Sequence, residues 1–186
     1  MKLYVMRHGE TLPNTMHLIT GKQECDLTKN GIKQAKEVKE KFHNINFDVI
    51  LTSPLSRARI TASTIVNKPI IIDKRLIERD YGAFEWKKKK DIDYNGYWNY
   101  HLNLNRNNGE SIKTLFMRIE NLIADLIRKY PHKTVLLVTH SGVARAIHYY
   151  ITGIPENGDL TPLEIPNCSC RVYEINEEEI DEVISH

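Results

Sequence analysis

The apolar positions of this chain follow two periods along its length. Short runs of β-branched and large apolar residues predict strands at residues 2–6, 48–51, 69–72, 134–138 and 171–175, and 180–184 is a candidate to pair with the last one or to fray. Apolar residues three or four positions apart predict helices over 29–43, 111–129 and 142–151, the last of which ends at Gly153. A further helix is expected to begin near Pro54. Because strands and helices alternate, we expect an α/β fold with three layers, a mostly parallel central sheet covered by helices on both faces.

Two of the expected helices carry clear local signals. Thr28 is a candidate N-cap of the first helix, and its apolar face is expected to be Ile32, Ala35, Val38 and Phe42. The helix at 111–129 has the longest apolar stripe, formed by Ile112, Leu115, Phe116, Ile119, Leu122, Ile123 and Leu126. Both faces are expected to pack in the core.

Residues 73–110 break this pattern and are rich in Asn, Tyr and Lys. A long irregular segment in a compact domain is usually functional or disordered, so we expect a lid-like insertion at about 79–110. Tyr97, Trp98 and Tyr100 either pack within this segment or cover a ligand, and the sequence leaves both open. The four lysines at 87–90 are flanked by acidic residues, which favours a solvated loop over a polyanion site.

Composition narrows the classes of protein to which this chain can belong. A length of 186 residues predicts one domain over 1–186, and a formal net charge of +2 gives no indication of nucleic-acid binding. The sequence contains no run of about 18 apolar residues, so no membrane span is expected, and no secretion signal is recognised. The three cysteines lack zinc-like spacing and are interpreted as reduced thiols in a cytoplasmic protein, without a metal. Either a monomer or a homodimer is compatible with the sequence.

Two of the expected strands end in similar histidine motifs. Arg7-His8-Gly9 follows the strand at 2–6, and Thr139-His140-Ser141-Gly142 follows the strand at 134–138. If these strands are parallel neighbours, both imidazoles lie at the edge of the sheet where α/β proteins bind ligands. A guanidinium beside an imidazole suits a phosphate, and a histidine can carry a phosphoryl group. Either histidine alone is more often structural, so the pair carries the argument.

Six motifs occur in a fixed order along the chain. They are Arg7-His8-Gly9-Glu10-Thr11, Leu27-Thr28-Lys29-Asn30-Gly31, Ser53-Pro54-Leu55-Ser56-Arg57-Ala58, Leu76-Ile77-Glu78, Gly109-Glu110-Ser111 and Val138-Thr139-His140-Ser141-Gly142-Val143. In these motifs the chain resembles the histidine phosphatase superfamily, the phosphoglycerate mutase-like proteins, from residue 2 to about residue 173.

The resemblance implies a role for each of five residues. His8 would be the nucleophile that forms a phosphohistidine, and Arg7, Arg57 and His140 would surround the phosphoryl oxygens. Glu78 would protonate the leaving oxygen and then assist the attack of water. The resemblance implies neither a metal nor an organic cofactor.

Other residues are rivals or secondary candidates. Arg59 competes with Arg57, and Glu10, Asp80 and Glu85 compete with Glu78; only the family pattern selects between them. Asn14, Gly21 and Ser141 are secondary candidates for contact with phosphate or substrate, although Asn14 and Gly21 could instead shape a turn. Glu110 and Ser111 could simply cap the long helix.

We therefore expect a metal-independent phosphatase that acts on a small phosphorylated metabolite. The stretch around Pro166-Asn167 resembles the α-ribazole phosphatase and broad-specificity subgroup, which makes α-ribazole 5'-phosphate a candidate substrate. One alternative is a cofactor-dependent phosphoglycerate mutase, against which the short segment between Glu78 and His140 argues, because a more open lid admits water. Another is a non-catalytic module that binds phosphorylated ligands, against which the presence of every expected catalytic residue argues. Leu18, Thr20 and Trp86 depart from the family pattern and leave the substrate contacts open.

Overall fold

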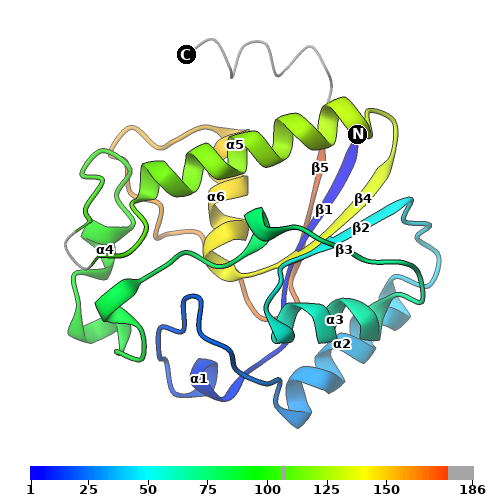
Figure 1. The fold of residues 1–186 in the computed structure, drawn as a ribbon, viewed down its shortest axis with the longest axis horizontal. Helices are drawn as coiled ribbons and strands as arrows, with labels where there is room; N and C mark the ends of the chain where they lie inside the picture. Colours follow the sequence, from blue (N-terminus) through cyan, green and yellow to red (C-terminus); the bar gives the residue numbers. More distant parts are fainter. Residues whose placement is uncertain (106–107, 176–186) are drawn as a thin grey trace.

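A five-stranded sheet organises the fold in the computed structural model, which describes residues 1–105 and 108–175. The strands are β1 (Lys2–Arg7), β2 (Val49–Thr52), β3 (Ile71–Ile72), β4 (Thr134–Thr139) and β5 (Cys170–Glu174), in the spatial order β3-β2-β4-β1-β5. All neighbouring pairs are parallel except β1 and β5 (Figure 1). The expected α/β fold with a mostly parallel sheet is confirmed.

Helices cover the sheet on both faces. Strand β1 shows why, because successive side chains of a strand point to opposite sides. Leu3 and Val5 pack in a core with α5 (Ile112–Lys129) and α6 (Ser141–Thr152). Tyr4 and Met6 pack in a second core with α2 (Lys29–Lys41) and α3 (Ser56–Ile65). The result is three layers, with the sheet in the middle (Figure 1).

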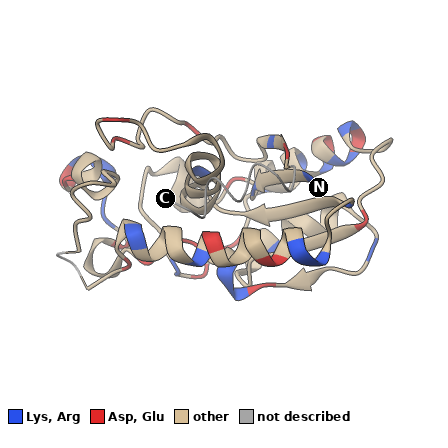
Figure 2. Ribbon diagram, turned by 90° about the horizontal axis from the view of Figure 1, so that it is seen from above, with Lys and Arg blue, Asp and Glu red and all other residues tan. Residues whose placement is uncertain are grey.

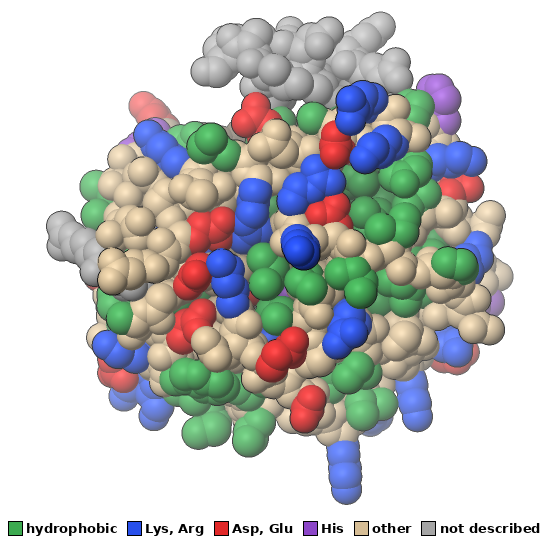
Figure 3. Space-filling view, viewed as in Figure 1, with side chains coloured by type: hydrophobic (Ala, Val, Ile, Leu, Met, Phe, Trp, Pro, Cys, Tyr) green, Lys and Arg blue, Asp and Glu red, His purple; other side chains and the backbone are tan. Residues whose placement is uncertain are grey.

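The long helices begin and end within one or two residues of the predicted positions. Thr28 Oγ1 accepts a hydrogen bond from Gly31 N at the start of α2, and Ser111 Oγ accepts one from Thr114 N at the start of α5. All seven residues of the expected α5 stripe are buried. Gly153, with φ of +92°, ends α6. Basic and acidic residues both occur along α5 (Figure 2), and side chains of the two signs intermingle over the face shown in Figure 3.

Several details differ from the sequence-based expectation. Ile32 is exposed instead of buried, because α2 turns Gly31, Ala35 and Val38 towards the core. Helix α3 begins at Ser56, two residues after Pro54, as expected. Strand β3 has only two residues, both exposed at the edge of the sheet. A short helix α1 (Leu12–Thr15) was not expected, and the candidate segment 180–184 lies outside the described residues.

The irregular segment after β3 contains short helical turns. These are η1 (Lys74–Leu76), η2 (Gly82–Phe84), η3 (Lys89–Asp91) and α4 (Tyr94–Tyr97). Tyr97 and Trp98 are buried, and Tyr100 packs against Phe116 with ring centroids 5.0 Å apart. These three aromatic residues therefore pack inside the protein. No helix in the part of the chain that the structure describes is both long enough and apolar enough to span a membrane.

Candidate active site

Two neighbouring parallel strands bring the two histidines together. β1 and β4 pair with Arg7 opposite Thr139, so His8 and His140 follow at the same edge of the sheet. His8 N donates a hydrogen bond of 2.9 Å to Thr139 O, and the two imidazole centroids lie 5.1 Å apart. Both side chains are buried. The expected convergence of the two imidazoles is confirmed.

His8 is oriented by its own backbone. Its Nδ1 lies 2.7 Å from Gly9 O, and because a carbonyl only accepts, Nδ1 carries the ring hydrogen. In this tautomer Nε2 carries a free lone pair, which accepts a hydrogen bond of 3.3 Å from Arg57 Nε. Burial, followed by the charges of Arg7 and Arg57, lowers the pKa of His8 well below its usual value. The imidazole is thus neutral at physiological pH, as a nucleophile must be.

Arg57 projects from α3 into the same site and is 1% exposed. Its Nη1 donates to Gln23 O at 2.6 Å and its Nη2 to Gly21 O at 2.8 Å. The rival Arg59 is exposed. Of these two arginines, only Arg57 lies beside His8.

Arg7 and His140, beside His8, each carry a buried polar atom without a hydrogen-bond partner among the described residues. Arg7 Nη1 donates to Ile165 O at 2.7 Å, while Arg7 Nε has no hydrogen-bond partner among the described residues. His140 Nε2 lies 2.7 Å from Ser53 Oγ, and its Nδ1 likewise finds no partner in the described part of the chain. Burial, then Arg57 and His8, lower the pKa of His140. A buried polar atom without a partner is costly, and a bound anion would supply one.

Glu78 is the carboxylate that faces this group. Its Oε2 accepts a hydrogen bond of 3.0 Å from Gly142 N in the first turn of α6, and its Oε1 accepts one of 2.8 Å from Arg79 N. A side chain at position 142 would collide with Glu78 and with Trp98. Gly142 therefore allows the carboxyl group of Glu78 to approach the N-terminus of α6.

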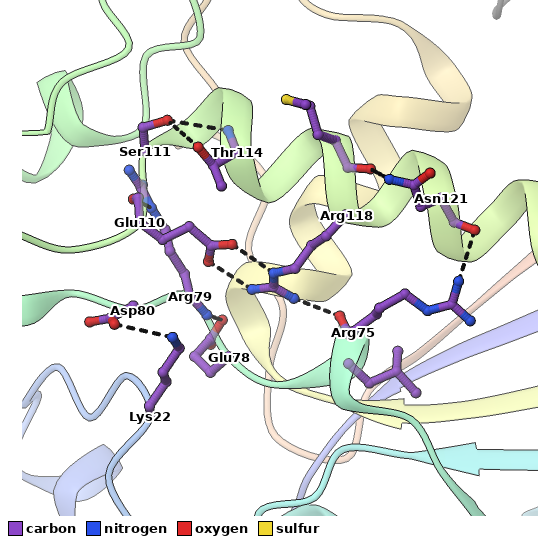
Figure 4. Close-up of polar contacts among 12 residues, drawn as sticks. Lys22, Arg75, Glu78, Arg79, Asp80, Glu110, Ser111, Thr114, Arg118 and Asn121 are labelled. Atoms are coloured by element: carbon purple, nitrogen blue, oxygen red, sulfur yellow. Dashed lines mark hydrogen bonds and ion pairs between the residues drawn. The ribbon is translucent and has the colours of Figure 1, made fainter.

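The backbone before Glu78 is attached to α5 and β4. Arg118 on α5 donates to Arg75 O at 2.6 Å and forms an ion pair with Glu110 at 2.7 Å (Figure 4). Thr139 Oγ1 donates to Leu76 O at 2.8 Å. Glu110 therefore does more than precede the helix cap: it holds the arginine that fixes this segment.

None of the three rival carboxylates lines the pocket. Glu10 accepts from Thr28 Oγ1 at 2.7 Å, beside the start of α2. Asp80 pairs with Lys22 (Figure 4), and Glu85 accepts from Lys22 N. Glu78 is thus the acidic residue that the structure brings to His8, among the four that the sequence offered.

A cavity of about 200 Å³ lies above these residues. Its base is lined by Arg7, His8, Arg57 and Glu78, and its sides by Asn14, His17, Leu18, Ile19, Thr20, Gly21, Tyr81, Lys89, Tyr94, Ser141 and Asn167. The secondary candidates Asn14, Gly21 and Ser141 therefore all line it. Among the described residues, no His, Cys, Asp and Glu side chains form a group that could hold a metal ion.

Sequence reasoning missed several residues of this cavity. Asn167 donates to His8 O at 3.1 Å and to Asn14 Oδ1 at 3.0 Å; its motif was noticed, but only as a subgroup resemblance. Lys89 is exposed, as expected for a solvated loop, but it also lines the cavity, with its Nζ 4.9 Å from the Tyr94 ring centroid. No signal in the sequence distinguishes Lys89 from the three lysines beside it.

Tyr94 enters the cavity from α4, held by a residue of α6. Arg145 Nη1 donates to Tyr94 Oη at 3.1 Å, and the Arg145 guanidinium lies 4.6 Å from the Trp98 ring centroid. Burial by itself raises the pKa of Tyr94, but the charges of Arg145 and Lys89 outweigh it and lower the pKa overall. This side of the cavity is therefore cationic.

Comparison with known proteins assigns the family. The chain matches the histidine phosphatase superfamily (branch 1) over residues 3–184. It is 30% identical over 164 residues to the adenosylcobalamin/alpha-ribazole phosphatase of Escherichia coli strain K12, covering 83% of this chain and 81% of that protein. It is also 31% identical over 218 residues to the 2,3-bisphosphoglycerate-dependent phosphoglycerate mutase of Buchnera aphidicola subsp. Cinara cedri, covering 94% of each.

A solved structure agrees with this assignment. A mutant phosphoserine phosphatase from Entamoeba histolytica, in complex with phosphoserine, superposes with a TM-score of 0.85 at 26% identity, covering 95% of this chain and 91% of that one. The resemblance inferred from the six motifs is confirmed. By its family and its relatives, this chain is a phosphatase of the histidine phosphatase superfamily, branch 1.

Proposed function

We propose that this protein hydrolyses small phosphate monoesters through a phosphohistidine on His8, without a metal ion. One observation carries the proposal: a neutral His8 presents an unprotonated Nε2 beside Arg57, in a cavity that also contains Arg7 and Glu78. The cavity volume of about 200 Å³ suits a phosphoryl group with a small leaving group. In this proposal the whole chain acts as one domain, with residues 79–110 as its lid.

The proposed reaction has two steps. First, His8 Nε2 attacks phosphorus, the bond from phosphorus to the ester oxygen breaks, and Glu78 gives its proton to the departing oxygen. Then water attacks the phosphorus, the phosphorus–nitrogen bond breaks, and Glu78 takes a proton from the water. Arg7, Arg57 and His140 donate hydrogen bonds to the phosphoryl oxygens, which stabilises the charge of the transition state in both steps.

Two substrate classes are candidates. The E. coli relative named an adenosylcobalamin/alpha-ribazole phosphatase supports α-ribazole 5'-phosphate. Lys89 favours a second class, because its ammonium group lies at the side of the cavity and suits a second negative group on the leaving part. Phosphoserine and 3-phosphoglycerate carry such a group, and the mutase relative makes transfer of the phosphoryl group an alternative to hydrolysis.

The first test is hydrolysis of p-nitrophenyl phosphate in excess EDTA by the wild type and by His8→Ala. We expect activity that survives chelation and is lost in the variant. Trapping of acid-labile phosphate on the wild type, but not on His8→Ala, identifies the covalent intermediate and excludes a module that only binds phosphate. Activity that survives in His8→Ala contradicts the mechanism.

A panel of substrates then separates the two classes. It contains α-ribazole 5'-phosphate, phosphoserine and 3-phosphoglycerate, the last with and without 2,3-bisphosphoglycerate. Release of inorganic phosphate indicates a phosphatase, whereas formation of 2-phosphoglycerate without phosphate release indicates a mutase.

A further inference from the structure

Glu85 lies at the end of η2, next to the cavity but outside its lining. Its carboxylate reaches a segment more than sixty residues earlier in the chain. Oε1 accepts a hydrogen bond of 3.0 Å from Lys22 N, and Oε2 accepts one of 2.5 Å from Gln23 Nε2. Because both oxygens are used, a single side chain holds the backbone of one residue and the amide of the next.

The opposite side of that segment contacts Arg57. Gly21 O and Gln23 O accept from its Nη2 and Nη1 at 2.8 and 2.6 Å. Arg57 Nε in turn lies 3.3 Å from His8 Nε2. The guanidinium is buried and carries no carboxylate partner among the described residues, so its fork is held by these two carbonyls and by a longer contact from Nη1 to Cys25 Sγ at 3.6 Å.

Gly21 connects the two sides of the segment. Its φ of +53° is a left-handed conformation, which glycine adopts without strain. A Cβ at this position would also collide with the Glu85 carboxylate. The same residue therefore permits the turn whose carbonyl faces Arg57 and leaves room for Glu85 on the other side.

We propose that Glu85 is a positioning residue for phosphate binding: it fixes residues 21–23 so that their carbonyls aim the Arg57 guanidinium at a phosphoryl group on His8. The inference rests on the proposed function, because it concerns the same site. Two backbone bonds also join the segments, from Trp86 N to Ile19 O and from Ile19 N to Lys87 O. These bonds do not involve the Glu85 side chain, so its removal should disturb the aim of Arg57 more than the fold.

The test compares Glu85→Ala and Glu85→Gln with a matched control, Asp80→Asn. Asp80 joins the same two segments through an ion pair of 3.1 Å with Lys22 Nζ, and Asp80→Asn removes the same charge (Figure 4). Each variant is made in the wild type and in an Arg57→Ala background. The measurements are kcat/KM for p-nitrophenyl phosphate, inhibition by orthovanadate, and binding of inorganic phosphate by calorimetry, with thermal unfolding to verify the fold.

We expect Glu85→Ala to reduce kcat/KM and the affinity for orthovanadate and phosphate about tenfold or more, because small misplacements in an active site are costly. Glu85→Gln should recover most of the loss, since its amide oxygen can accept from Lys22 N and Gln23 can turn its own amide. Asp80→Asn should change each value less than about twofold, as for an exposed ion pair. In the Arg57→Ala background, Glu85→Ala should cause no further loss.

Equal losses from Glu85→Ala in both backgrounds, or an equal loss in Asp80→Asn, would overturn the proposal. If Glu85→Ala does not fold, Gln23→Leu takes its place in the test, because it removes the hydrogen bond from Gln23 Nε2 to Glu85. It should likewise reduce kcat/KM in the wild type and cause no further loss in the Arg57→Ala background. A wild type that binds phosphate without turnover contradicts the proposed function, and phosphate binding still decides the role of Glu85. A wild type that neither binds phosphate nor hydrolyses ester contradicts both.

Discussion

The base of the cavity and its sides are built in different ways. At the base, His8 directly follows β1 and Arg57 projects from α3, while His140 follows the paired strand β4 and lies buried beside His8, outside the cavity lining. At the sides, residues 17–21 and Tyr81, Lys89 and Tyr94 come from irregular segments and short helical turns, joined by a few backbone contacts such as the bridge between Leu18 and Lys88. The base is buried, whereas Lys89 is exposed. Regular structure thus places His8, His140 and Arg57, whereas Glu78 and the groups proposed to contact the leaving part come from irregular segments or short helical turns.

The largest loss of activity should come from Glu78→Gln. Glu78 lies where the base of the cavity meets its sides. The amide keeps an acceptor for Gly142 N but cannot act as an acid, so kcat should fall about 10²- to 10⁴-fold. The measurement is kcat for an alkyl phosphate and for p-nitrophenyl phosphate. The alkyl ester should lose more, because its leaving oxygen needs the proton; equal losses would contradict the assignment of Glu78 as the acid.

The burial of His8 and His140 should make the stability of the folded protein depend on pH. The folded protein lowers the pKa of His8 and of His140, so below about pH 6.5 the unfolded chain binds protons that the folded chain does not. The stability they contribute is present above that pH and is lost as the pH falls, by up to about 1.4 kcal/mol per pH unit for each histidine. Urea unfolding between pH 7 and 5 measures the slope. His140→Asn should make it shallower, and an unchanged slope would argue against burial of a neutral His140.

Ser53→Ala should reduce activity by freeing His140, without changing the proposed nucleophile His8. Ser53 Oγ is the only partner of His140 Nε2 among the described residues, so its loss frees the ring to turn. We expect kcat to fall about 10- to 100-fold. Thr52→Val is the control, because Thr52, the last residue of β2, directly precedes Ser53, is also buried, and donates from its Oγ1 to Val138 O at 3.2 Å. A similar loss in both variants would indicate a general effect on the strand.

Lys89→Met should give the smallest effect, confined to the sides of the cavity. Loss of one charge-assisted contact should raise KM for phosphoserine or 3-phosphoglycerate about 3- to 10-fold, with a smaller change for p-nitrophenyl phosphate, which lacks a second anionic group. Lys88→Met is the matched control, since Lys88 is exposed and does not line the cavity. If all three substrates respond alike, Lys89 acts through the general charge of the site and not through a specific contact.

The errors of the sequence analysis have identifiable physical causes. Ile32 was assigned to the buried face of α2, but Gly31 packs so closely on the Glu10 backbone that a side chain there would collide with it, and this contact turns Ile32 outwards. Nothing local distinguishes Lys89 from its neighbours, and it is brought to the cavity by contacts of the preceding residues with residues 18–19, namely the bonds from Trp86 N to Ile19 O and from Ile19 N to Lys87 O and the bridge between Leu18 and Lys88. Both errors concern contacts between segments that are distant in the sequence.

The sequence by itself determined the layers of the fold and the base of the site. Apolar periodicity specified the strands and helices, and histidines at two strand ends must meet once those strands pair in parallel. The choice of Glu78 and Arg57 over their rivals came from motif resemblance, since periodicity does not distinguish them. Only the tertiary structure decided which loop residues line the cavity and what Glu85 contacts. Hydrogen bonds between irregular segments depend on where the whole fold places their backbones, and no local pattern records that placement.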